Sequence, residues 1–195
     1  MKTILMTTLV LAAGVTSEAQ TTNWKIDHSH SSVKFSVTHM VVSEFDGDFK
    51  KFDGKFSTAG DDFTTANVEF TIDVNSINTD NERRDTHLKS DDFFNAAKYP
   101  FMKFTGKSLK KTGEKTYILS GDLTIRDVTK QINLNVTYNG TIIDPYKNTR
   151  AGFKVTGSID RFDYNLKWNS MMDTGGAVVG NMVDFQTNIE LTKEK

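Results

Sequence analysis

The stretch Asn67–Val74, with the sequence NVEFTIDV, decides the fold class of this chain. Apolar and polar residues alternate strictly along it. Successive side chains of a β-strand point to opposite faces, so the alternation predicts a strand with one buried and one solvated face. Strands of a parallel α/β sheet are buried on both faces and show continuous apolar runs instead. The stretch therefore favours an antiparallel sheet.

The same alternation recurs on both sides of this stretch and predicts about eight strands in all. The phase slips at Phe52–Gly54, where the Asp-Gly pair predicts a turn or a bulge. Eight antiparallel strands can close into a barrel that its own side chains fill, or that holds one small ligand. A two-sheet sandwich is the competing architecture. Gly121 and Gly157 fall on the inward face and favour the barrel, because glycines leave room inside and permit sharp strand curvature.

Composition narrows the class of protein. The chain has 195 residues, of which 37% are hydrophobic and 25% charged, as is typical of one soluble globular domain. A formal net charge of −1 argues against a nucleic-acid binder, which would show a basic patch. The absence of cysteine excludes disulfides, thiolate catalysis and a cysteine-based metal site. His28 and His30 have a spacing that suits one strand face, but no matching ligand cluster accompanies them, so we expect no metal and no cofactor.

The N-terminus has the pattern of a secretory signal peptide. Lys2 precedes an apolar run, Ile4–Val15, that is too short to span a bilayer. Ser17 and Ala19 place small residues where a signal peptidase reads, so we expect residues 1–19 to be removed by cleavage after Ala19. The alternative is a buried N-terminal helix. The expected location of the mature chain, residues 20–195, is the periplasm or outside the cell.

The segment Thr79–Pro100 breaks the alternation. Thr79 followed by Glu82 predicts a capping box and a polar helix to about Lys89. A second short helical turn is expected over Asp92–Ala97, and Pro100 ends the excursion. A helix this polar does not belong in a core, so we expect the segment to lie as a lid or rim across one end of the barrel. Its apolar anchors would be Leu88, Phe93 and Phe94.

Several motifs resemble one known family. They include Trp24–Asp27 with His30–Phe35, the run Asn81–Phe94 (NERRDTHLKSDDFF), Gly121–Ile125 and Ala151–Phe153. This combination resembles the YceI-like family of periplasmic, lipocalin-like proteins, which are also called polyisoprenoid-binding. Lys89 departs from the pattern, since the family is expected to carry arginine there, and a point charge then replaces a planar fork.

The resemblance implies an eight-stranded antiparallel lipocalin-like barrel over residues 20–195, with a short helical segment at about 79–98 near one end. It also implies a long apolar cavity that holds an isoprenoid or a similar tail, and in many members a homodimer. The residues expected to line the cavity combine this implication with the inward phase of the strands. They are Phe35, Val37, His39, Val68, Phe70, Ile72, Phe94, Leu123, Ile125, Leu134, Val136, Phe153, Val155, Trp168 and Phe185.

A polar head of the ligand has three candidate partners, Arg83, Arg84 and His87. Arg83 and His87 are four residues apart and share one helix face, and two guanidinium groups with an imidazole could meet a phosphate or a quinone oxygen. The alternative is a solvated helix whose arginines pair with neighbouring carboxylates. His39 likewise has two interpretations, a hydrogen-bonded core histidine or a contact for a polar ligand atom.

The expected function is to carry or sequester a long-chain apolar lipid, such as a polyisoprenoid, an isoprenoid quinone or a fatty-acid-like molecule. Burying about a dozen CH2 groups contributes roughly 10 kcal/mol, against roughly 4–15 kcal/mol lost on association, which favours a long chain. We expect neither nucleic-acid partners nor stable membrane insertion of the mature chain. One alternative is an enzyme acting on an isoprenoid or quinone through His39 or His87, although no catalytic motif is present. Another is a stress-response interaction module with a filled barrel.

Overall fold

The computed structural model describes residues 20–173 and 175–195. The predicted signal peptide, residues 1–19, lies outside the described residues. Within those residues no helix is both long enough and apolar enough to cross a membrane.

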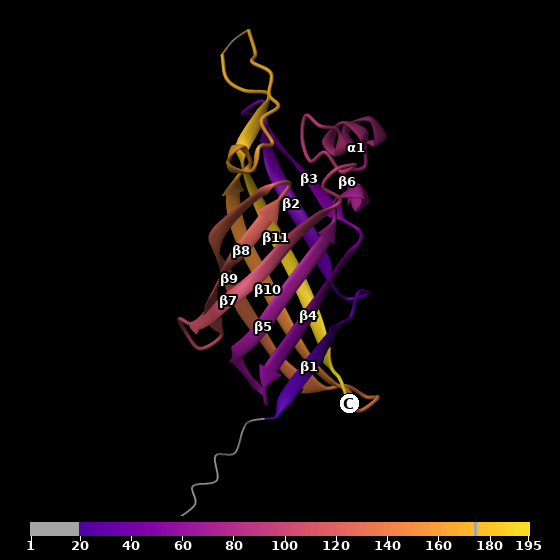
Figure 1. The fold of residues 1–195 in the computed structure, drawn as a ribbon, viewed down its shortest axis with the longest axis vertical. Coiled ribbons are helices and arrows are strands. Elements are labelled where there is room, and N and C mark those ends of the chain that lie inside the picture. Colours follow the sequence, from indigo (N-terminus) through magenta and orange to yellow (C-terminus); the bar gives the residue numbers. More distant parts are fainter. Residues whose placement is uncertain (1–19, 174) are drawn as a thin grey trace, which may run out of the picture.

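One antiparallel sheet contains eleven strands in the described part of the chain, and it dominates the molecule (Figure 1). The strands are β1 Thr21–Ile26, β2 Ser32–His39, β3 Ser43–Phe49, β4 Phe52–Ala59, β5 Asp62–Asp73, β6 Ile77–Asn78, β7 Phe101–Lys111, β8 Thr116–Ile125, β9 Val128–Ile143, β10 Thr149–Asp160 and β11 Val179–Lys193. The helix α1 covers Glu82–Lys89, and the short 3-10 helices η1 and η2 cover Val74–Ser76 and Arg161–Tyr164.

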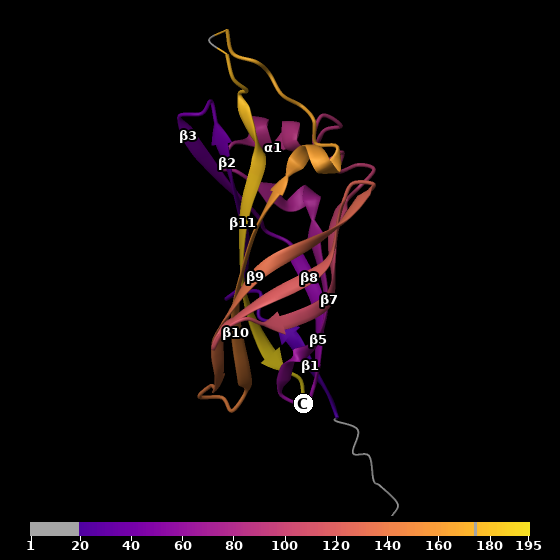
Figure 2. The ribbon, with the colours of Figure 1, turned by 90° about the vertical axis from the view of Figure 1, so that its left-hand side faces the viewer.

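Eight of these strands form a closed barrel, in the order β1, β4, β5, β7, β8, β9, β10, β11 and back to β1. Trp24 of β1 pairs with Lys193 of β11 and completes the ring. The predicted barrel is therefore confirmed, and the sandwich alternative is wrong. β11 is long enough to pair with β1 near one end and with β2 over most of its length, so β2, β3 and β6 continue the wall beyond β1 (Figures 1 and 2).

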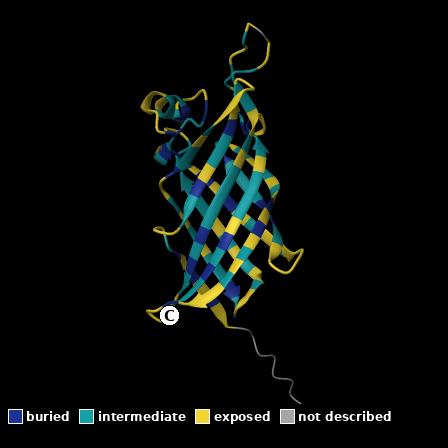
Figure 3. Cartoon of the chain, turned by 180° about the vertical axis from the view of Figure 1, so that it is seen from behind, coloured by how far each residue is buried: buried dark blue, intermediate teal, exposed yellow. Residues whose placement is uncertain are grey.

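Buried and exposed residues alternate along the barrel strands, as Figure 3 shows. The alternation places the apolar residues inside, where they form two clusters. One cluster, which includes Val33, Phe49 and Leu88, lies under α1. The other, which includes Trp24, Phe153 and Leu191, fills the end where β1 begins and β11 finishes. Period-two alternation with one buried face is thus the pattern that a small barrel requires.

Two predictions about glycines need correction. The expected turn or bulge at Phe52–Gly54 is wrong, because this segment belongs to β4. The connection between β3 and β4 lies at Lys50 and Lys51 instead. Gly54 is needed for close packing, since a Cβ there would lie 2.7 Å from the carbonyl oxygen of Glu69. Gly121 and Gly157 do not leave empty room, because the rings of Phe104 and Phe185 occupy the space that side chains there would take.

The segment around α1 differs in detail from the prediction. The helix cap is Asn81, whose side-chain oxygen accepts from the backbone N–H of Arg84 at 3.0 Å. Thr79 is not the cap; its hydroxyl donates to the Asp85 carboxylate at 2.6 Å. Asp92–Ala97 forms turns rather than a second helix. The segment nonetheless lies at one end of the barrel, as expected (Figure 1).

Candidate binding cavity

The barrel encloses one large apolar cavity of about 680 Å³. This volume falls within the roughly 300–1,000 Å³ that is typical of small-molecule sites. Aromatic and aliphatic side chains from both core clusters form most of its wall. The alternative of a fully packed barrel is therefore wrong.

Every residue that was predicted for the cavity lies on its wall. These residues are Phe35, Val37, His39, Val68, Phe70, Ile72, Phe94, Leu123, Ile125, Leu134, Val136, Phe153, Val155, Trp168 and Phe185. Contact between these side chains and a ligand stays a prediction. The prediction missed further wall residues, among them Phe63, Ile189 and Arg161. Ile189 shares the period-two phase of Phe185 and could have been found, whereas no sequence signal marked Phe63 or Arg161.

Aromatic rings fill the end of the barrel that is remote from α1. Phe63 packs against Trp24, Tyr138 and Phe153, with ring centroids 5.1, 5.6 and 5.0 Å apart. The indole N–H of Trp24 donates to the Thr58 hydroxyl at 3.1 Å, which satisfies its buried donor. Trp24, Thr58 and Phe153 are buried. This end of the cavity is therefore closed by a packed cluster.

The other end of the cavity reaches the surface beside α1. Asn81 and Arg83 are exposed and also belong to the cavity wall. Phe45 of β3 and Val178, which precedes β11, continue the wall on the opposite side. The opening, called the mouth below, thus lies between α1, the β2–β3 hairpin and the segment before β11.

Arg84 is committed to holding α1 in place. Its Nε donates to the Thr79 hydroxyl at 2.8 Å, and its Nη2 donates to the Thr79 carbonyl oxygen at 2.7 Å. Its guanidinium also lies 4.5 Å from the centroid of the Phe45 ring. Arg84 therefore joins the helix to the end of β6 and to β3.

His87 is held by a carboxylate and by aromatic rings. Its Nε2 is 2.9 Å from Oδ2 of Asp92. Its ring stands edge-on to Phe93 and Trp168, at centroid distances of 5.1 and 4.9 Å. The imidazole therefore belongs to the cavity wall, with its Nε2 paired to Asp92.

Arg83 is the cation at the mouth without a fixed partner. Among the residues that the structure describes, its guanidinium makes no hydrogen bond or ion pair, although the alternative of a solvated helix would pair the arginines with Glu82, Asp85 and Asp91. Asp85 is instead bound by Thr79, and Asp91 by Arg126 at 3.0 Å. Of the three predicted head-group residues, all on the wall, Arg83 is the one whose side chain has no hydrogen-bond or ion-pair partner among the described residues.

His39 also lines the cavity but is not a buried, hydrogen-bonded core histidine. Its ring packs edge-on to Phe45, with centroids 6.4 Å apart. No hydrogen bond of its ring is found within the described part of the chain. A contact between His39 and a polar ligand atom stays a prediction.

Arg161 is a cation on the cavity wall that the sequence did not reveal. It is 3% exposed, and it donates to the carbonyl oxygens of Gly180, Leu166, Trp168 and Val179 at 2.8, 2.5, 2.8 and 3.2 Å. Burial away from water lowers the pKa of this guanidinium. These bonds tie both ends of the segment between η2 and β11 to the barrel.

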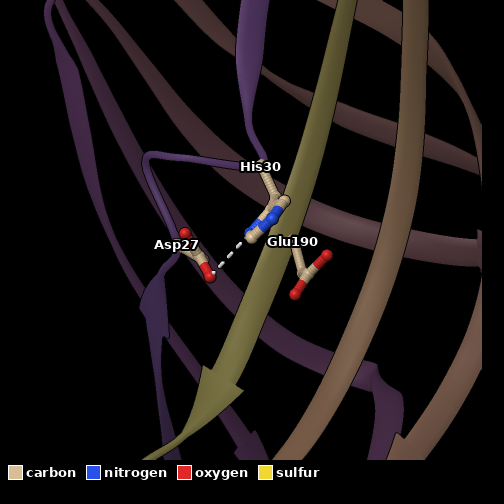
Figure 4. A group of neighbouring side chains, drawn as sticks. All are labelled: Asp27, His30 and Glu190. Atoms are coloured by element: carbon tan, nitrogen blue, oxygen red, sulfur yellow. Dashed lines mark hydrogen bonds and ion pairs between the residues drawn. The ribbon is translucent and has the colours of Figure 1, made fainter. Parts of the chain in front are cut away.

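Asp27, His30 and Glu190 form a polar cluster on the outside of the barrel (Figure 4). Their ligand atoms lie within 4.8 Å of one another, a spacing that could suit a metal. However, Nη1 of Arg150 lies 2.6 Å from both Asp27 and Glu190, so a guanidinium already pairs with both carboxylates. His28 does not join the cluster and lies 3.9 Å from Asp53 instead.

The charges of this cluster shift its titration. Hydrogen bonds from Ser29, His30 and Arg150 hold the pKa of Asp27 well below its usual range. The Asp27 carboxylate raises the pKa of His30. Arg150 also donates to Asp144 at 2.7 Å and lowers the pKa of that carboxyl to about 2. The cluster therefore acts as an ionic clasp between the β1–β2 connection, the β9–β10 turn and β11.

The closed barrel, its apolar interior and the polar helix at its mouth define the class of lipocalin-like barrels. The model of the YceI-like domain matches residues 24–191, and the chain belongs to this family. The resemblance drawn from the motifs is thereby confirmed.

Relatives and solved structures agree with this assignment. UPF0312 proteins of Staphylococcus aureus are 36% identical over 172 residues, which cover 88% of this chain and 98% of those proteins. The YceI protein of Campylobacter jejuni is 28% identical and superposes with a TM-score of 0.71 over 81% of this chain and 90% of that one.

Two more distant structures share the fold. BcnA of Burkholderia cenocepacia superposes with a TM-score of 0.74 at 22% identity, over 85% of this chain and 98% of that one. A polyisoprenoid binding domain from Saccharophagus degradans gives a TM-score of 0.66 at 20% identity, over 88% of this chain and 98% of that one.

Proposed function

We propose that this protein carries or sequesters a long-chain apolar lipid in its barrel, as a periplasmic or secreted binding protein. The observation that carries the proposal is the cavity of about 680 Å³, which has an apolar wall, one closed end and one mouth. Such a shape suits a ligand that enters tail first and leaves its other end at the mouth. The name of the Saccharophagus degradans domain supports an isoprenoid tail, through the shared fold alone.

The size of the hydrophobic effect supports a long tail. Each buried CH2 contributes about 0.8 kcal/mol, whereas association costs roughly 4–15 kcal/mol. A tail of a few carbons therefore binds weakly, and a tail of fifteen or more carbons, counted as about that many CH2 groups, can bind well.

The polar end of the lipid would lie near Arg83. A phosphate, a carboxylate or a quinone oxygen can accept hydrogen bonds from a guanidinium. We propose no covalent chemistry. Nε2 of His87 pairs with Asp92, His39 packs against Phe45, and within residues 20–173 and 175–195 neither imidazole is hydrogen-bonded to a nucleophile.

Binding of two isoprenoid alcohols tests the proposal. We expect geranylgeraniol to bind at least about tenfold more tightly than geraniol, because it buries twice the apolar chain. Val155→Trp should abolish binding of geranylgeraniol, since residue 155 lies on the cavity wall. Lys154→Trp is the matched control, because Lys154 is the exposed neighbour of Val155 on β10 and its side chain points outward. Equal affinity for both alcohols, or undiminished binding by Val155→Trp, would contradict a cavity-bound tail.

A further inference from the structure

The turn between β2 and β3 has an unusual backbone for its residues. Met40 and Val41 have φ values of 51° and 65°, and the N–H of Val42 donates to the carbonyl oxygen of His39 at 3.2 Å. This is the geometry of a type I′ hairpin turn, which strongly favours Asn-Gly. A β-branched residue such as Val41 is an outlier in the left-handed region, because its side chain crowds the backbone.

The same turn displays its apolar side chains to solvent. Met40, Val41 and Val42 are 40%, 73% and 86% exposed. Met171, on the neighbouring segment before β11, is 71% exposed. The two segments are adjacent, since a Cβ built on Gly176 would lie 3.8 Å from Cγ2 of Val41. We call Met40, Val41, Val42 and Met171 the apolar tip.

The apolar tip adjoins the mouth of the cavity. Phe45 follows the turn and Val178 follows the neighbouring segment, and both belong to the cavity wall. Figure 2 shows the β2–β3 hairpin and this segment at the same end of the barrel as α1. Apolar surface therefore runs from the tip into the cavity. A backbone cost kept at a site of exposed apolar residues points to a function there.

Charge around the tip indicates the kind of partner. The stretches 39–46 and 169–182, which include the apolar tip, contain no lysine or arginine and carry Glu44, Asp46 and Asp173, whereas the cations at the mouth, Arg83 and Arg84, lie on α1. Docking on an anionic membrane relies on basic side chains. An uncharged or zwitterionic lipid surface is the partner that this chemistry fits.

We propose that the apolar tip docks the mouth onto a zwitterionic lipid surface, so that a lipid moves between the bilayer and the cavity without crossing water. The proposal rests on the proposed lipid-carrying function. A long tail that crosses water exposes every methylene, and the exposure cost rises with its length. Direct contact between the mouth and the bilayer removes that exposure.

One variant separates docking from folding. Met40→Asn/Val41→Gly installs the residues that a type I′ turn favours and removes two exposed apolar side chains. Its melting temperature should equal or exceed that of the parent, because the backbone strain is relieved. A loss of docking in a protein that is no less stable cannot then be attributed to unfolding.

Flotation with phosphatidylcholine vesicles, with no ligand present, measures docking directly. We expect the mature parent protein to float with the vesicles, and the double variant to lower the bound fraction about tenfold. The matched control is Ile142→Ser/Ile143→Ser, which removes isoleucines that are 64% and 73% exposed at the opposite end. The control should float like the parent. Adding phosphatidylglycerol should not strengthen binding. Val42→Ser, outside the left-handed positions, should lower binding in the same direction.

Several results would overturn the docking proposal. These are parental flotation of the double variant, an equal loss in the isoleucine control, or stronger binding to phosphatidylglycerol. If sedimentation shows that the variant instead dissociates a dimer while flotation is unchanged, the tip is an interface between copies. Binding of geranylgeraniol added from ethanol distinguishes the two proposals. If the parent does not bind it, lipid carriage is contradicted, whereas the flotation result still tests docking.

Discussion

Phe185 of β11 is the cross-strand partner of Gly157 on β10, and both residues face the cavity side of the barrel wall. A Cβ on residue 157 would lie 2.6 Å from Cζ of Phe185 and 2.8 Å from Cδ2 of Leu134. The glycine therefore lets the ring lie flat against the wall instead of projecting into the cavity.

Gly157→Ala should destabilise the barrel and narrow its cavity. The added methyl group must displace two packed side chains, which typically costs about 1–3 kcal/mol. Urea denaturation measures the change in the free energy of unfolding. Gly152→Ala is the matched control on the same strand, since a Cβ there meets nothing closer than 3.5 Å. Equal effects of the two variants would show that Phe185 does not depend on Gly157.

Arg161→Met should loosen the segment between η2 and β11. The change removes the guanidinium donor from four carbonyl oxygens, of which that of Val179 still accepts from the Asn169 amide at 2.9 Å, while those of Leu166, Trp168 and Gly180 lose the bond from Arg161. We expect a loss of about 2–4 kcal/mol of stability, because each buried polar group left unpaired costs about 1–3 kcal/mol. Limited proteolysis should then cut within residues 165–180. Arg83→Met, at an exposed position, should change stability by less than about 0.5 kcal/mol. Resistance of Arg161→Met to proteolysis would contradict the role of Arg161 in holding the segment between η2 and β11.

The pair of His30 and Asp27 should make stability depend on pH. The pKa of His30 is raised in the folded state by the Asp27 carboxylate, so the folded protein holds this proton more tightly. The stabilisation is full below the ordinary pKa of 6.5 and disappears as pH rises through the folded-state pKa. Relative to His30→Asn, the parent should melt higher at about pH 5 and equally at about pH 9. A gap that is constant with pH would contradict the ion pair.

His28→Asn serves as the control for this measurement. His28 is exposed, and the nearest oxygen of Asp53 is 3.9 Å away. We expect its melting temperature to follow that of the parent at both pH values. A shift as large as that of His30→Asn would assign the effect to general charge rather than to the clasp.

Arg83→Gln should weaken the binding of lipids that carry an acidic head group. The variant keeps a polar side chain at the mouth but removes the charge, so geranylgeranyl phosphate should lose about tenfold in affinity and geranylgeraniol should not change. Lys89→Gln, on the same helix but outside the cavity wall, is the control. Loss of affinity for both lipids alike would mean that Arg83 shapes the mouth but does not bind the head group.

The period of the sequence was sufficient to predict antiparallel strands with one buried face, because that pattern is dictated by local geometry, but it left a sandwich open, and the barrel followed from the family resemblance. The period also predicted which residues of the barrel strands line the cavity, such as Phe70 and Val155. The capping box misled, because Thr79 and Asn81 are both good caps and only the tertiary bond from Thr79 to Asp85 decides between them. Arg161 could not be predicted, since its partners are backbone carbonyls that only the folded chain brings together.

Native mass spectrometry of the mature protein, purified without detergent from its own host, tests the lipid cavity most directly. We expect a bound species whose mass matches a long-chain apolar lipid, recovered in an organic extract and absent from Val155→Trp. A single mass equal to that of the bare chain, with no lipid in the extract, would contradict lipid binding in the cavity.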